Sequence, residues 1–242
     1  MGIINLQIDQ SYLEKAVAEL SLHGFPSTGI LRKLFNAFSG NVEHSRKMQS
    51  MINWIDLLEK KYRETTTSIV YGLAHFIKQQ EDGAFSQSQP FYFPSTSYFT
   101  EDAVTRSFAL SEKLAQLLNV FEELGVLESG PSYKAVSFSK ISNMTKIDLS
   151  ALDTSLKNLN PERHAHTHGM TPEMTRHQIT GVFAGSINGE RPIEVIMHGI
   201  DESKLPVTPY QQLFRCKDVM DKFTTAVSKV FEAIEQSLEP EE

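Results

Sequence analysis

The sequence contains a single cysteine, Cys216, among its 242 residues. One thiol excludes an internal disulfide and a cysteine-based zinc site, and it is typical of proteins in a reducing compartment. Apolar runs are only a few residues long, and the first ten residues, MGIINLQIDQ, contain neither a basic patch nor an apolar segment. We therefore expect no membrane-spanning helix and no signal peptide, and we expect the protein in the cytoplasm.

Positive charge is also scarce. The chain has 23 lysines and arginines against 30 aspartates and glutamates, which gives a formal net charge of −7. This balance argues against a protein whose whole surface coats nucleic acid or an anionic membrane, so any binding of nucleic acid must be local. The sequence also lacks a glycine-rich phosphate loop and a nucleophile elbow. Its hydrophobic content of 40% is enough to fill real cores.

Apolar residues recur at helical spacing through much of the first 80 residues. The pattern predicts helices at about residues 10–20 and 28–39, and a longer helical segment from residue 42 to residue 77. The stretch ETTTS at residues 64–68 interrupts the longer segment with three β-branched threonines. Because such residues disfavour helix, we expect two consecutive helices with a break there.

The last third of the chain predicts a mixture of helix and strand. A short helix carrying Leu156 and Leu159 is expected to end at Pro161, and residues 176–200 predict a β-hairpin around Asn188-Gly189. An apolar stripe then marks a terminal helix of about five turns. Its residues are Val219, Phe223, Val227, Val230 and Ile234. The stripe fits either a homodimer contact or packing against its own domain.

The central segment carries the most regular pattern. Thr100 is a good N-cap for a short helix, leucines line one face of residues 110–124, and Gly125 can end that second helix. Residues 126–138 then alternate around a Ser-Gly-Pro-Ser turn, as in two short strands. The segment, with FEELGVLES at its centre, resembles the winged-helix (winged helix-turn-helix) domains of bacterial and phage regulators over roughly residues 66–140.

This resemblance implies a recognition helix that enters the major groove of duplex DNA and a wing that follows it. The residues expected to contact DNA are Arg106, Ser111, Lys113, Gln116, Asn119 and Lys134. Between residues 101 and 140, however, there are four basic residues against six acidic ones. This weak local charge leaves open the alternative that the winged helix is a docking surface for another protein.

A histidine-rich stretch follows Pro161. In an extended segment, His164, His166 and His168 would share one face, and three imidazoles on one face can bind zinc. The alternative is that these are surface histidines without a ligand, so that the protein has no cofactor.

Together these patterns predict an α+β, predominantly helical protein. We expect a helical N-terminal region at 1–65, a winged-helix domain at 66–142, and a C-terminal α+β region at 143–242 with a β-hairpin and a long terminal helix. The function expected first is a non-enzymatic, DNA-binding transcription regulator, with duplex DNA as its partner. A module that binds a protein partner is the second reading, and a metal-dependent enzyme at the histidines is the third.

Overall fold

The computed structural model describes residues 7–26, 29–38, 41–82, 94–126, 136–168, 177–187, 191–200 and 208–238. Its helices are α1 (Gln10–Leu20), α2 (Ile30–Asn36), α3 (Val42–Glu81), α4 (Pro94–Phe121), α5 (Phe138–Ser142), α6 (Ser150–His168) and α7 (Pro209–Leu238). Two strands, β1 (His177–Ile187) and β2 (Arg191–Ile200), pair antiparallel. None of the helices in these ranges is both long enough and apolar enough to cross a membrane.

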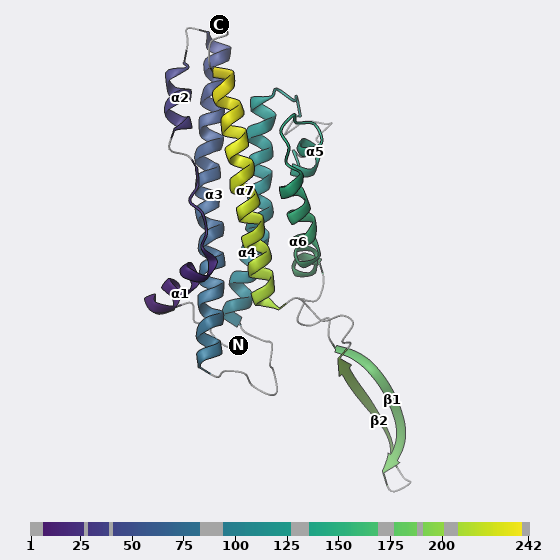
Figure 1. Cartoon of the computed structure of the whole chain (residues 1–242). Helices are drawn as coiled ribbons and strands as arrows, with labels where there is room; N and C mark the ends of the chain where they lie inside the picture. Colours follow the sequence, from purple (N-terminus) through teal and green to yellow (C-terminus); the bar gives the residue numbers. More distant parts are fainter. Residues whose placement is uncertain are drawn as a thin grey trace.

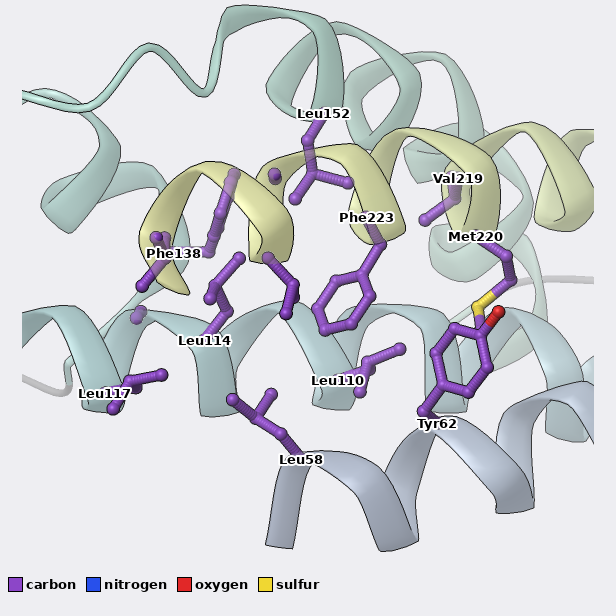
Figure 2. Close-up of a cluster of buried hydrophobic side chains, with 14 of the residues drawn as sticks. Leu58, Tyr62, Leu110, Leu114, Leu117, Phe138, Leu152, Val219, Met220 and Phe223 are labelled. Atoms are coloured by element: carbon purple, nitrogen blue, oxygen red, sulfur yellow. The ribbon is translucent and has the colours of Figure 1, made fainter. Parts of the chain in front are cut away.

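Three long helices, α3, α4 and α7, lie side by side and form the centre of the bundle (Figure 1). Helices α1 and α2 pack against α3, and α6 packs against α4 and α7. Phe223 of α7 is fully buried, and Figure 2 shows its ring in a cluster with Leu58 and Tyr62 of α3 and Leu110 of α4. One hydrophobic core therefore joins helices that lie more than 150 residues apart in the sequence.

The α+β class predicted from the sequence is wrong, because the core is built by helices. Strands β1 and β2 pair with each other and extend away from the bundle (Figure 1). The core residues whose burial is described all come from helices or from the segments that join them. The strand pair therefore adds no layer to the core, and the fold is an all-helical bundle.

The predicted winged helix is also wrong. It requires a turn between two helices near residue 109, but α4 runs unbroken from Pro94 to Phe121. Ala103, Val104, Leu110 and Leu114 are all fully buried, so one continuous apolar face crosses the predicted turn. Phe138 begins helix α5 where the returning strand of the wing was expected. The rest of that wing, residues 127–135, lies outside the described residues.

Helix α3 passes through the threonine run without the predicted break. The hydroxyl groups bond back to carbonyl oxygens one turn earlier, as Thr65 Oγ1 does to the oxygen of Lys61 at 2.8 Å. Buried Tyr62 and Ile69 hold the helix on both sides of the run. Tertiary packing thus overrides the low helix propensity of threonine. The domain boundary predicted between residues 65 and 66 lies inside this helix.

The apolar stripe of α7 faces the interior of its own chain. Val219, Phe223, Val227, Val230 and Ile234 are each at most 1% exposed, and α7 contacts α2, α3, α4 and α6. The stripe is therefore occupied by the bundle, and a partner helix has no access to it without opening the core.

Candidate functional site

Helix α6 carries the histidine-rich stretch, and it continues past Pro161 to His168. The predicted helix end at Pro161 is therefore wrong. Leu159, two positions before the proline, and Glu162, directly after it, are both buried and fix the helix against its neighbours. The proline removes one backbone donor, but this packing holds the helix in place.

The helical conformation separates the three histidines that an extended segment would place on one face. Each residue advances about 100° around a helix, so His164 and His168 lie one turn apart on one side. His166 lies about 200° from His164, close to the opposite side. The prediction that the three imidazoles share one face is therefore wrong. No group of three or more potential metal ligands occurs within the described part of the chain. Zinc binding by these residues stays a prediction.

Helices α6 and α7 run antiparallel, and three polar pairs join them. Ser155 donates from Oγ to Oδ2 of Asp218 at 2.5 Å, and Glu162 forms an ion pair with Arg215. Nε2 of His166 lies 3.0 Å from Oε1 of Gln212. We call these three pairs the α6–α7 seam: Ser155–Asp218, Glu162–Arg215 and His166–Gln212.

The ion pair of the seam is asymmetric in burial. The Glu162 side chain is 3% exposed, whereas the Arg215 side chain is 45% exposed. A buried carboxylate is costly without a cation, so Glu162 fixes one end of the guanidinium while the rest reaches solvent. Arg215 is thereby held in a defined position at the surface, where an anionic ligand can approach it.

Arg163 lies on the other side of α6. Its Cζ atom is 4.5 Å from the centre of the Phe108 ring of α4, which is a cation–π contact that restricts the position of the guanidinium. Arg163 and the next residue, His164, are both exposed. The C-terminal half of α6 therefore presents an ordered arginine beside an exposed histidine, with position 168 one turn further on.

This part of the molecule is less acidic than the rest. Residues 150–168 and 209–222 contain five lysines and arginines against four aspartates and glutamates, while the whole chain has 23 against 30. These two segments taken together therefore repel a polyanion less than the average of the chain does.

The residues predicted to contact DNA do not form an equivalent surface. Lys134 lies outside the described residues, and the other five are on α4, where their polar groups are used within the chain or are partly buried. Arg106 bonds from Nε to Asp102 at 2.6 Å and from Nη1 to Glu64 at 2.6 Å. Asn119 bonds through both side-chain atoms to the backbone of Val126.

Two of the remaining three residues of that set also have partners within the chain. Ser111 is buried and donates to the carbonyl oxygen of Phe108, and the Lys113 ammonium lies 5.5 Å from the centre of the Trp54 ring. Gln116 is half-buried, with its Oε1 shielded from solvent.

The histidines of RHAHTH were predicted as candidate site residues, but Arg163, which directly precedes His164, was not. The partners on α7, Arg215 and Gln212, were not predicted either. Adjacent arginine and histidine residues are a signal visible in the sequence. The partners on α7 follow only from the packing of the two helices.

Comparison with protein families decides the classification. The model of the HEPN_Cthe2314-like HEPN family matches residues 54–235, which is more than half of the chain and includes all of α6 and most of α7. The chain belongs to this HEPN family. No curated protein and no solved structure matches the chain. Membership of an all-helical HEPN family overturns the winged-helix assignment and with it the expected transcription regulator.

Proposed function

We propose that this HEPN protein is a ribonuclease whose active site is the C-terminal half of α6, with Arg163, His164 and His168 as its catalytic residues. HEPN domains are often ribonucleases, and they typically bind nucleotides or resemble ribonucleases. Family membership therefore does not support the expectation that the chain is not an enzyme. The observation that carries the proposal is the exposed Arg163–His164 pair, with His168 one helical turn away.

The chemistry of RNA cleavage suits these residue types. The 2′-hydroxyl of the substrate attacks the adjacent phosphorus, so the enzyme must remove one proton and supply another to the leaving 5′-oxygen. Histidine ordinarily titrates near pH 6.5, so one imidazole can act as base while a second acts as acid. An arginine donates paired N–H groups to the phosphate oxygens as negative charge develops. The products are a 2′,3′-cyclic phosphate and a 5′-hydroxyl.

The two histidines and the arginine have distinct expected roles. We assign His164 and His168 to proton transfer, because they lie on one side of the helix. We assign Arg163 to the phosphate, because its guanidinium is restrained by Phe108 and remains exposed.

Cleavage of a fluorescent single-stranded RNA in the presence of EDTA tests the proposal. His164→Ala and His168→Ala should each lower the rate about 100- to 10,000-fold, which is the range of general acid–base catalysis. Arg163→Lys should also lose activity, because lysine keeps the charge but cannot make the paired hydrogen bonds. Lys157→Ala is the matched control on the same helix, since its side chain is 71% exposed, and it should cleave at the wild-type rate.

Two results would contradict the proposal. One is RNA that stays intact with the full chain, and the other is a rate that the three substitutions leave unchanged. Each variant should be purified identically and without a histidine tag, so that a contaminating ribonuclease appears equally in all samples. Activity that EDTA abolishes and zinc restores would instead support the metal-dependent enzyme predicted from the histidines.

We also propose a cytoplasmic location. The thiol of Cys216 is buried, and burial raises its pKa to about 12, so it stays protonated and unreactive. A chain with this single thiol is suited to a reducing compartment.

A further inference from the structure

A surface hollow of about 550 Å³ lies beside the α6–α7 seam. This volume is in the range of small-molecule sites. The hollow is lined from two helices, by Ser155 and Asn158 of α6 and by Tyr210, Phe214, Arg215 and Asp218 of α7. The mechanism proposed above uses neither the aromatic residues nor the aspartate of this hollow.

The aromatic side of the hollow is held in place. Tyr210 and Phe214 lie one turn apart with ring centroids 4.6 Å from each other, and Phe76 supports Tyr210 with centroids 5.2 Å apart. The hydroxyl of Tyr210 donates to Oε1 of Glu19 at 2.8 Å. Tyr210 and Phe214 remain half-exposed, so a flat aromatic ligand can stack on them.

The acidic side of the hollow is also oriented. Asp218 accepts the hydroxyl of Ser155 on Oδ2, which leaves acceptor capacity on both carboxylate oxygens for a ligand. A carboxylate best receives two adjacent N–H donors. Among the four RNA bases, only guanine presents two adjacent donors on its Watson–Crick edge, N1–H and N2–H. Adenine has one donor beside one acceptor there, cytosine has one donor beside two acceptors, and uracil has one donor between two acceptors.

The hollow and the proposed catalytic histidines lie on different sides of α6. Residues 155 and 164 are nine positions apart, which corresponds to about 14 Å along the helix axis and about 180° around it. Arg215 lines the hollow and can bind the phosphate of a nucleotide whose base lies there.

From these observations we infer that the hollow binds an unpaired guanine base of the RNA. The base stacks on Phe214 and Tyr210, and its N1–H and N2–H groups donate to the carboxylate of Asp218. This inference goes beyond the proposed function, because the hollow and the proposed catalytic histidines lie on different sides of α6 and each can be tested without the other.

Calorimetric titration with GMP, AMP, CMP and UMP tests the inference without any cleavage. The wild-type chain should bind GMP at least tenfold more tightly than the other three nucleotides. Asp218→Asn replaces one acceptor oxygen by an N–H donor, so the side chain then matches the edge of adenine. This variant should lose at least tenfold in GMP affinity and gain in AMP affinity. Asp153→Asn, which removes the same charge from α6 away from the hollow, should bind all four as the wild type does.

Equal affinity for the four nucleotides would overturn the inference, as would an Asp218→Asn variant that weakens all four alike. Phe214→Leu is a second variant, which keeps an apolar side chain but removes the stacking surface. It should weaken GMP binding about tenfold, and an unchanged affinity would also count against the inference. If GMP binds as expected and RNA stays intact, the guanine site stands and the ribonuclease proposal fails. If RNA is cut but GMP binds no more tightly than the other three nucleotides, the ribonuclease proposal stands and the guanine site fails.

Discussion

Replacing Phe223 by alanine should remove a central contact of the bundle. The side chain is fully buried, its ring lies 6.1 Å from the ring of Tyr62, and Figure 2 shows it pointing from α7 into the core cluster. Truncation of a buried phenylalanine leaves a cavity and costs about 3 to 5 kcal/mol. For a chain of this size, about 2 to 4 °C is lost per kcal/mol, so the melting temperature should fall by about 6 to 20 °C.

Urea denaturation followed by circular dichroism measures this loss of unfolding free energy. Lys222→Ala is the matched control, because it truncates the exposed neighbour and should change the unfolding free energy by less than about 0.5 kcal/mol. The slope of free energy against urea should be the same for Phe223→Ala and the wild type. A loss below about 1 kcal/mol for Phe223→Ala would refute the single core that joins α3, α4 and α7.

Two further predictions concern the edges of the bundle. Asn119→Ala should lower the unfolding free energy by about 1 to 3 kcal/mol, because it leaves the backbone N–H and C=O of Val126 without their side-chain partners. A urea titration that shows no loss of unfolding free energy would contradict this role of Asn119. The second concerns Asp148, whose pKa is lowered to about 2, first by hydrogen bonds from Ser150 and then by Lys229. Because the folded pKa lies below the ordinary value of 3.8, its stabilisation is complete above about pH 4 and is lost as the pH falls through 2. Wild-type protein should therefore melt at a higher temperature than Asp148→Asn at pH 5 and at nearly the same temperature at pH 2, whereas a difference that is constant with pH would contradict the assignment.

Apolar periodicity predicted individual helical faces well. Leu110, Leu114 and Leu117 were expected on one buried face, and all three are fully buried. Gly125 was expected to end the helix in a left-handed conformation; its φ is 67°, but α4 already ends at Phe121. These features depend on residues within a few turns of one another, which a sequence pattern records directly.

The errors arose where tertiary packing outweighed local preference. The threonines at 65–67 and Pro161 both disfavour helix, yet α3 and α6 continue through them because buried neighbours hold them in place. The turn predicted before Leu110 failed for the same reason, since the buried face of α4 is continuous. Two consecutive helices and one continuous helix give the same local spacing of apolar residues, so the sequence pattern alone does not distinguish them.

The candidate site was only partly visible in the sequence. The histidines of α6 were noticed, but an extended chain was assumed, which placed His166 on the wrong side. The partners in the seam are separated by 63, 53 and 46 residues in the sequence. Such pairs form only when α6 packs antiparallel to α7, so no local motif indicates them.

End-group analysis of the cleaved RNA tests the central proposal most directly. Single-stranded RNA incubated with the full chain in EDTA should yield fragments that carry 2′,3′-cyclic phosphates and 5′-hydroxyls by mass spectrometry. The double variant His164→Ala with His168→Ala should yield none of them. Intact RNA with the wild-type chain, or the same fragments with the double variant, would contradict a ribonuclease site on α6.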